Sequence, residues 1–144
     1  MTSPHSTLWQ QDAKACAQRA LACLDLTSLN DNDTERDIAR LCERAQTPFG
    51  AVAAVCVWPR LAAFARSQLP DHIAVAAVAN FPDGSDDAQR AVADTQAIVQ
   101  SGAQEVDVVL PYARLQAGDL RAVSNLLTAV RKASANLRLK VILE

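Results

Sequence analysis

Short apolar runs alternate with amphipathic segments along the chain. The five runs cover residues 22–27, 51–58, 73–80, 105–111 and 137–143 and are rich in Val, Leu, Ile and Ala. Between them, apolar residues recur every three or four positions, which is typical of helices that cover a core. Buried strands joined by helices predict a parallel sheet with right-handed crossovers.

Local signals mark the ends of the expected helices. An additional helix before the first run is expected over Trp9–Ala20, and residues 1–7 are expected to be disordered. Pro59 suits the first helical position, Ser85 is a candidate N-cap, and Gly102 a candidate C-terminal glycine. The remaining helices are expected after the polar turn at 30–34, from Pro59, over Ser85–Ser101 and over 117–135. Residues 1–144 are expected to form a single domain.

Each helix carries an apolar stripe that is expected to face the core. The stripes contain Trp9, Ala13, Cys16 and Ala20; Ile38, Leu41, Cys42 and Ala45; Leu61, Phe64, Ala65 and Leu69; Ala88, Val92, Thr95 and Val99; and Leu120, Val123, Leu127 and Val130.

The run at 105–111 is unusual because it combines strand character with two carboxylates, Glu105 and Asp107. Alternation along a strand places both on one face and Val106 and Val108 on the other. A buried carboxylate is costly unless it is paired or used. A partner is therefore expected opposite Asp107, and Lys140 in the last run is the candidate.

Polar residues share one face in the outer runs as well. Cys23, Asp25 and Thr27 lie on one face of the first run, and Lys140 lies with Ile142 on one face of the last. An open doubly wound sheet, with helices on both sides, would be apolar on both faces. A barrel with a site in its interior has one polar and one apolar face.

This asymmetry favours an α/β fold that forms part of a (β/α)8 (TIM) barrel, with about five parallel strands and an extra N-terminal helix. The chain also lacks the GxGxxG and GxxxxGK[ST] loops of nucleotide-binding open sheets. A full barrel needs about 250 residues, so 144 residues supply little more than half of one. The first and last strands are expected to be open edges, which invite pairing.

Composition excludes several classes of function. The net charge of -2 gives no basis for binding nucleic acid or an anionic membrane, and no apolar run approaches the roughly 20 residues that span a bilayer. The polar N-terminus lacks the apolar region of a signal peptide, so a cytoplasmic protein is expected. The cysteines, Cys16, Cys23, Cys42 and Cys56, form no CxxC pair, so no metal site is expected and most should be small buried residues.

Five motifs, in this order, resemble deoxyribose-phosphate aldolase. They are Leu-Asp-Leu-Thr-Ser-Leu-Asn at 24–30, Ala-Val-Cys-Val-Trp-Pro-Arg at 54–60, Asn-Phe-Pro-Asp-Gly at 80–84, Glu-Val-Asp-Val-Val-Leu-Pro-Tyr at 105–112 and Leu-Lys-Val-Ile-Leu-Glu at 139–144. The resemblance begins at about residue 12. It implies a (β/α)8 barrel and a Schiff-base aldolase without metal or other cofactor, which cleaves 2-deoxyribose 5-phosphate to glyceraldehyde 3-phosphate and acetaldehyde.

The resemblance also implies roles for individual residues. Asp107 corresponds to a proton-relay aspartate, and Lys140 to a lysine that supports it. Substrate-binding positions correspond to Asp25, Thr27, Cys56 and Asn80. Structural alternatives stay open, because Asp107 and Lys140 could simply neutralise each other, Cys56 could be a core residue and Asn80 a turn residue. Arg60 is expected to be a solvated residue at a helix start.

The imine-forming lysine of the family, on a sixth strand, has no counterpart here. Of Lys14, Lys132 and Lys140, only Lys140 is placed to face the interior. The chain is therefore expected to be an N-terminal part of the aldolase that is inactive alone. Its expected partners are a sugar phosphate or aldehyde in the intact enzyme, and a second copy or a complementary half-barrel chain. The alternatives are a self-associating half-barrel module and an open α/β ligand-binding domain.

Overall fold

Five parallel strands form the main sheet of the protein. The computed structural model describes residues 4–134 and 136–143, with side chains from Asp12 onward. The strands are β1 (Asp25–Thr27), β4 (Ala54–Val57), β5 (Ala74–Ala79), β6 (Glu105–Val109) and β7 (Arg138–Ile142), and they pair in the order β1-β4-β5-β6-β7. Each lies within one of the predicted apolar runs, and β1 and β7 are the edges of the sheet, as predicted.

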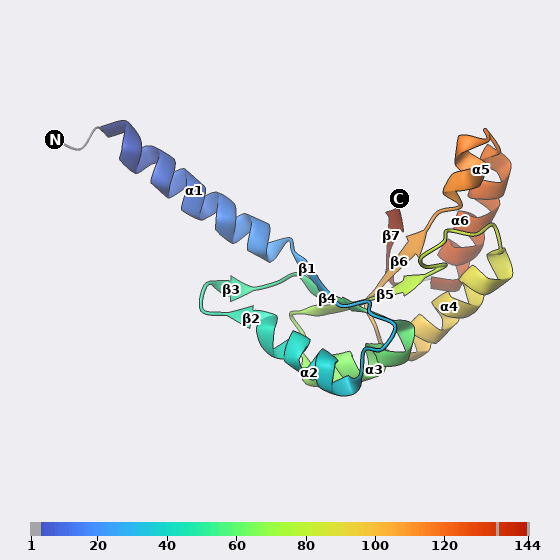
Figure 1. Ribbon diagram of the computed structural model, residues 1–144, viewed down its shortest axis with the longest axis horizontal. Coiled ribbons are helices and arrows are strands. Elements are labelled where there is room, and N and C mark those ends of the chain that lie inside the picture. Colours follow the sequence, from blue (N-terminus) through green and yellow to red (C-terminus); the bar gives the residue numbers. More distant parts are fainter. Residues whose placement is uncertain (1–3, 135, 144) are drawn as a thin grey trace.

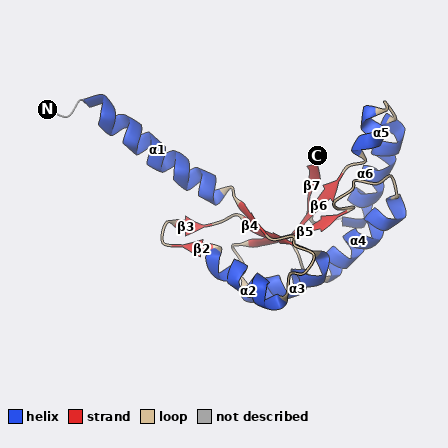
Figure 2. Cartoon of the chain, viewed as in Figure 1, coloured by secondary structure: helices blue, strands red, loops and turns tan. Residues whose placement is uncertain are grey.

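Helices cover only one face of this sheet. They are α2 (Glu35–Arg44), α3 (Pro59–Gln68), α4 (Ala88–Gln100) and α6 (Leu120–Ser134), and they form the outer layer of a crescent whose inner layer is the sheet (Figures 1 and 2). Consecutive members of this set contact one another. The one-sided arrangement confirms a partial barrel and is the opposite of the doubly wound alternative.

The apolar core lies between the helices and the outer face of the sheet. It includes Ile38, Leu41, Leu61, Ala65, Ile98, Leu126 and Val130 from the helices, and Val55, Val57, Val75, Val106 and Val108 from the strands. The inner face carries smaller side chains, with Cys56, Ala76 and Val78 in a separate cluster against Leu29, Trp58 and Phe81. Small inner residues leave room above the sheet for longer side chains from neighbouring strands.

The N-terminal region differs from the predicted one. Helix α1 runs over Pro4–Ala22 and projects from the crescent (Figure 1), so it begins before Trp9. The prediction of disorder over residues 1–7 falls partly on residues 1–3, which lie outside the described residues. Cys16 and Cys23 are exposed, so the prediction of burial is wrong for these two cysteines.

A small hairpin was missed by the strand prediction. Strands β2 (Gln46–Thr47) and β3 (Gly50–Ala51) pair antiparallel, and α1 packs against β3. The predicted strand at 51–58 is therefore divided, and its main part begins only at Ala54.

Two helix boundaries also differ from the predicted ones. Helix α4 begins at Ala88 with Asp87 as N-cap, whose carboxylate accepts a hydrogen bond from the Arg90 amide, so the assignment of Ser85 as cap is wrong. The segment predicted as one helix over 117–135 instead contains the end of a loop after α5 (Tyr112–Gln116), with Gly118 at φ +78°, before α6 begins at Leu120.

Two predicted stripes are rotated relative to the core. Helix α4 buries Ala91, Thr95 and Ile98 and leaves Val99 42% exposed. Helix α6 buries Leu126, Val130 and Ser134, and Leu127 packs partly buried against the core, so Val130 and Leu127 of the predicted stripe face it whereas Leu120 is 65% exposed. No helix among the described residues is long and apolar enough to cross a membrane.

Gly84 is held in a position that only glycine fits, which generates a stability prediction. Its φ is +55°, and an added Cβ would lie 2.6 Å from the Leu110 carbonyl oxygen and 2.8 Å from the Tyr112 ring. Gly84→Ala should lower the free energy of unfolding by about 2–4 kcal/mol, because backbone strain and a clash add together. Urea unfolding followed by circular dichroism measures the change.

Gly118 provides a matched control for this variant. Its φ is +78°, but an added Cβ meets nothing within 4 Å. Gly118→Ala should therefore lower the free energy of unfolding only through backbone strain, by about 1–2 kcal/mol. Equal losses for the two variants would show that the packing of Gly84 against Leu110 and Tyr112 is not important.

Candidate functional site

Lys140 lies at the centre of a cluster of carboxylates on the inner face of the sheet. Its ammonium Nζ forms an ion pair with Asp25 of β1, lies 2.9 Å from Glu105 Oε2 and lies 3.1 Å from Asp107 Oδ1, both on β6. Glu105 is also paired with Arg138, whose guanidinium lies 2.7 Å from its Oε1. The predicted pairing of Lys140 with Asp107 is confirmed, and two further carboxylates join it.

The contact between Lys140 and Asp25 requires a strongly curled sheet. Lys140 is on β7 and Asp25 on β1, the two opposite edges. In a flat sheet four strand spacings would separate these edges by roughly 19 Å, at about 4.8 Å per pair. The two side chains can meet only because the sheet bends toward its inner face. The cluster therefore occupies the interior of a partial barrel.

Asp107 is a buried carboxylate with one oxygen, Oδ1, that lacks a hydrogen-bond donor among the described residues. Its Oδ2 accepts a hydrogen bond from the Cys56 thiol at 3.5 Å. The approach of Lys140 to Oδ1 is an ion-pair contact without hydrogen-bond geometry, and Oδ1 has no hydrogen-bond donor among the described residues. Burial raises the pKa of Asp107 by more than Lys140 and the Cys56 thiol lower it. The group is thus suited to exchanging a proton at Oδ1.

Lys140 is held in its charged form. Burial works against its ammonium, but hydrogen bonds to Asp25 and Glu105 and the attraction of Asp107 outweigh it and raise the pKa of Lys140 above its ordinary value. A nucleophilic amine needs a lowered pKa. Lys140 therefore acts here as a cation that positions carboxylates and not as an attacking amine.

Cys56 is a hydrogen-bond donor in this site. Burial, followed by the negative charge of Asp107, raises the pKa of the Cys56 thiol to about 12. A thiolate is required for nucleophilic attack, so the protonated thiol serves only to orient Asp107. Cys56 therefore lies beside Asp107 in the candidate site, and its substrate-binding role stays a prediction.

Thr27 and Asn80 lie apart from the charged cluster. The Thr27 hydroxyl donates to the Asp25 carbonyl oxygen at 3.1 Å, which fixes the backbone beside the carboxylate. Asn80 is fully buried at the end of β5, with φ +54°. Its amide donates to the carbonyl oxygens of Ser85 and Val109 and accepts from the Ser85 hydroxyl. These bonds tie the loop after β5 to β6.

A second polar network fixes the loop after β1. The Asp33 carboxylate accepts hydrogen bonds from the Ser28 hydroxyl and from the backbone and side-chain amides of Asn30. Burial opposes its charge, but these bonds hold the pKa of Asp33 below its ordinary value. Arg60 donates to the carbonyl oxygens of Asp33 and Asp31 at 2.8 and 2.9 Å.

Arg60 is exposed at the start of α3, as predicted, but its guanidinium also joins two loops at the strand ends. The adjacent Trp58 donates its indole N–H to the Asn30 carbonyl oxygen at 3.1 Å, and its ring packs edge-on against Phe81 at 5.4 Å. The sequence signal that could have identified this network is the polar turn at 28–34 opposite Arg60.

No cluster of His, Cys, Asp and Glu with metal-binding geometry occurs among the described residues.

A parallel sheet curled around charged side chains, with helices only on its outer face, defines a section of a (β/α)8 barrel with an interior site. The chain belongs to the DeoC/LacD family of aldolases, whose sequence model matches residues 19–144. It is 47% identical over 141 residues to the deoxyribose-phosphate aldolase of Agrobacterium fabrum, which covers 96% of this chain and 54% of that protein. The resemblance predicted from the motifs is confirmed.

Solved structures give the same result for the fold. A chain from Coccidioides immitis described as a deoxyribose-phosphate aldolase superposes with a TM-score of 0.77 and 28% identity, over 94% of this chain and 60% of its own. A tetrameric deoxyribose phosphate aldolase from Aeropyrum pernix superposes with a TM-score of 0.69, over 99% of this chain and 60% of its own. Its sequence identity to this chain is 24%, so this match supports the fold alone. The chain spans about half the length of the curated relative it matches.

Removing Lys140 should destabilise the fold. Lys140→Met leaves Asp25, Glu105 and Asp107 without their shared cation, and the free energy of unfolding should fall by about 2–3 kcal/mol. Lys14→Met, on the exposed part of α1, should change it by less than about 0.5 kcal/mol. Urea unfolding at pH 7 measures both variants.

Lys140→Met should also change how the free energy of unfolding depends on pH. Because folding raises the pKa of Lys140, its stabilising contribution is fully present below its ordinary pKa of 10.5 and is lost as the pH rises through the raised value. Unfolding free energy should fall more steeply above pH 10.5 in the wild type than in Lys140→Met. Parallel curves for the two proteins would contradict the ion cluster.

The four cysteines should divide into two classes of reactivity. Cys16 and Cys23 are exposed, whereas Cys42 and Cys56 are buried with raised pKa values. Alkylation of Cys56 by iodoacetamide at pH 8 should accelerate on the order of 10³-fold when the chain is unfolded in urea, because a thiol with a pKa near 12 is almost fully protonated. Peptide mass spectrometry follows each site, and labelling of Cys56 in the folded chain as fast as Cys16 would contradict its burial.

Proposed function

We propose that this chain provides five of the eight barrel strands of a deoxyribose-phosphate aldolase that cleaves 2-deoxyribose 5-phosphate to glyceraldehyde 3-phosphate and acetaldehyde. The observation that carries the proposal is the buried Asp107, whose raised pKa and lack of a hydrogen-bond donor at Oδ1 are suited to moving a proton inside the barrel. Identity of 47% to a curated enzyme of that name supports the choice of substrate.

Schiff-base cleavage of an aldol needs several proton transfers. A lysine amine adds to the substrate aldehyde, and the carbinolamine loses water to form an imine. The C3 hydroxyl then gives up its proton as the C2–C3 bond breaks, and the resulting enamine is protonated at carbon before hydrolysis releases acetaldehyde. Asp107 is proposed to move these protons. Lys140 keeps Asp107 oriented, with Asp25 and Glu105 balancing its charge.

The imine-forming amine is proposed to come from outside this chain. Lys140 is held as an ammonium by three carboxylates, and Lys14 and Lys132 lie on the helices α1 and α6. A complementary section of barrel would supply the lysine. The chain by itself is therefore proposed to bind no substrate covalently and to turn none over.

The other functions considered from the sequence have less support. An open α/β ligand-binding domain would have helices on both faces of its sheet, whereas here they lie on one. A purely structural, self-associating module would not need a lysine and three carboxylates inside the barrel, because charged clusters there are costly to assemble.

A chimera tests the proposed role of Asp107. The chain is joined to the part of the Agrobacterium aldolase that it does not match, and cleavage of 2-deoxyribose 5-phosphate is followed by the release of glyceraldehyde 3-phosphate. Asp107→Asn in the chimera should lower kcat by about 10²–10⁴-fold, because a positioned proton carrier is lost. Asp71→Asn, in an exposed loop before β5, is the control and should leave kcat unchanged.

The chain alone provides the complementary measurement. Borohydride reduction in the presence of substrate should leave Lys140 unlabelled, because the amine is protonated. A covalent adduct on Lys140 together with turnover by the chain alone would overturn the proposed division of roles. A chimera whose Asp107→Asn variant keeps full kcat would remove Asp107 from the chemistry.

A further inference from the structure

Glu105 lies between two cations inside the partial barrel. Its side chain is 6% exposed, its Oε1 accepts a hydrogen bond from the Arg138 guanidinium at 2.7 Å, and its Oε2 lies 2.9 Å from Lys140 Nζ. Asp107 lies two residues further along β6 and has a single cation, Lys140, within ion-pair distance among the described residues. The two buried carboxylates of β6 therefore share one ammonium but differ in their other partners.

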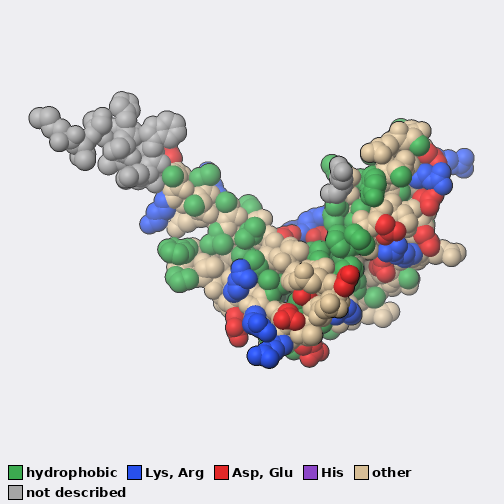
Figure 3. All heavy atoms as spheres, viewed as in Figure 1, with side chains coloured by type: hydrophobic (Ala, Val, Ile, Leu, Met, Phe, Trp, Pro, Cys, Tyr) green, Lys and Arg blue, Asp and Glu red, His purple; other side chains and the backbone are tan. Residues whose placement is uncertain are grey.

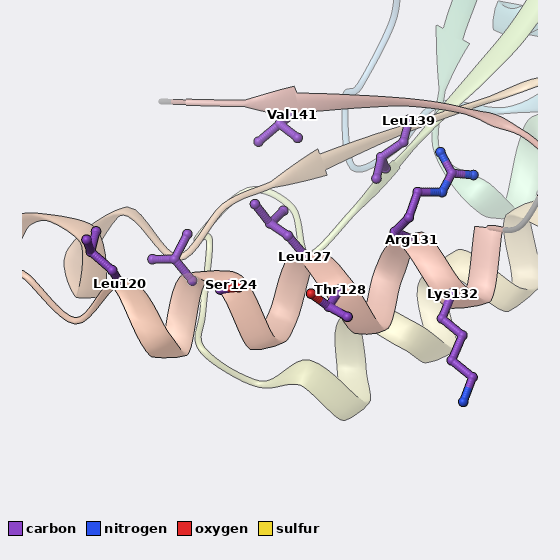
Figure 4. A pocket seen from close by; sticks show the side chains of 9 residues that line it. Leu120, Ser124, Leu127, Thr128, Arg131, Lys132, Leu139 and Val141 are labelled. Carbon is purple, nitrogen blue, oxygen red and sulfur yellow. The ribbon is translucent and has the colours of Figure 1, made fainter.

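Both cations approach Glu105 from β7. Leu139 and Val141 point from this strand toward α6 (Figure 4), so the side chains that alternate with them lie on the opposite, inner face. In the register of the two strands, Lys140 is the direct neighbour of Asp107 and Arg138 that of Glu105. Lys140 Nζ nevertheless lies closer to Glu105, at 2.9 Å, than to Asp107, at 3.1 Å. Glu105 thus draws the ammonium away from its direct neighbour.

The charges of this cluster do not balance. Three carboxylates face two cations, namely Asp25, Glu105 and Asp107 against Lys140 and Arg138. Full ionisation would leave excess negative charge inside the barrel, which one proton removes. A proton on Glu105 would weaken contacts with two cations, whereas a proton on Asp107 weakens a contact with one. Asp107 also has the oxygen without a hydrogen-bond donor among the described residues.

We propose that Glu105, held in place by Arg138, is a positioning residue that directs the proton of this cluster to Asp107. Glu105 holds the Lys140 ammonium beside Asp107 Oδ1 without hydrogen-bond geometry, which leaves this oxygen available for a proton. Arg138 acts through Glu105, because its guanidinium contacts that carboxylate. The inference rests on the proposed function, in which Asp107 moves protons, and it assigns the residues that keep Asp107 able to do so.

The other elements around Asp107 contribute fewer charges. Cys56 of β4 donates its thiol to Oδ2, and Asp25 of β1 adds a smaller negative influence. Strand β5 places the apolar Val78 beside Asp107. Glu105 and its two cations are therefore the partners whose replacement should change the protonation of Asp107 most.

A polar cavity adjoins the outer end of this charge relay. It has a volume of about 440 Å³, and Glu105 and Arg138 line it together with Asp71 and His72. The two loop residues can titrate independently of the cluster. A titration read at Asp107 itself, and not from the whole protein, separates their protonation from that of the cluster.

Carbon-13 NMR of labelled aspartate carboxyl groups measures Asp107 in this chain, with its signal assigned through Asp107→Asn. Glu105→Gln should move the titration midpoint of Asp107 at least about one pH unit lower, because a neighbouring negative charge is lost and Lys140 turns toward Asp107. Arg138→Met should move it at least about half a pH unit higher, because Glu105 then attracts Lys140 more strongly and repels a second negative charge.

Arg40→Met is the matched control. Acidic and basic side chains are spread over the outer helical layer (Figure 3), where Arg40 of α2 pairs with Asp37 at 3.6 Å. Its replacement removes the same charge and an ion pair on the far side of the sheet, so the Asp107 midpoint should not change. The Arg138 side chain is 73% exposed, so Arg138→Met should keep the circular dichroism of the wild type and provides the test if Glu105→Gln fails to fold.

The double variant Glu105→Gln/Arg138→Met shows whether Arg138 acts through Glu105. In the Glu105→Gln background, Arg138→Met should shift the Asp107 midpoint by less than half as much as in the wild type. An unchanged midpoint in Arg138→Met, a higher midpoint in Glu105→Gln, or an equal effect of Arg138→Met in both backgrounds overturns the inference.

Activity provides a second measurement in the chimera. The acid limb of its kcat/KM profile should move in the same direction as the Asp107 midpoint in each variant, whereas a merely structural role of Glu105 would lower stability and move neither. A chimera that cleaves no 2-deoxyribose 5-phosphate, beside midpoints that shift as expected, would contradict the proposed function and support the inference. An active chimera with unshifted midpoints would support the function and contradict the inference.

Discussion

The ion cluster around Lys140 constrains both the shape of the sheet and its chemistry. One ammonium has to serve carboxylates from β1 and β6 while it is anchored on β7. In a medium of low polarity, any of these groups left without a partner would be strongly destabilising. The cluster therefore favours the curled form of the sheet, in which the two edges approach each other. Burial, and to a smaller extent the negative charge of Asp25, raise the pKa of Asp107 and so disfavour its ionisation.

The outer face of the sheet packs against the helices, and the inner face carries the candidate functional site. Valines of β4, β5 and β6 pack against helices on the outer face, whereas the inner face of β4 and β5 carries Cys56 and Ala76. Small residues there allow long side chains from β6 and β7 to lie over the middle of the sheet. The loops at the strand ends are fixed separately, by Arg60 and Asp33 after β1 and by Asn80 after β5.

Apolar runs joined by helices were enough to predict the parallel sheet, and the alternation of side chains in the strands predicted its polar inner face and the pairing of Asp107 with Lys140. It could not predict the contact of Lys140 with Asp25, because that contact depends on curvature across four strand spacings. Nor did it predict that Ser85 bonds Asn80 in preference to capping α4, since both are local hydrogen bonds of similar strength. The spacing of Leu120, Val123, Leu127 and Val130 is that of a core-facing stripe, but spacing alone does not show how far along the helix the core extends, and Leu120 is left exposed.

The curl of the sheet has a consequence for assembly. Binding normally costs free energy when loops and edges must first be ordered into the bound shape. Here Lys140 links β7 to β1 through Asp25, which fixes the separation of the two free edges. The sheet is therefore preorganised, and one lysine side chain sets how far apart its two free edges lie.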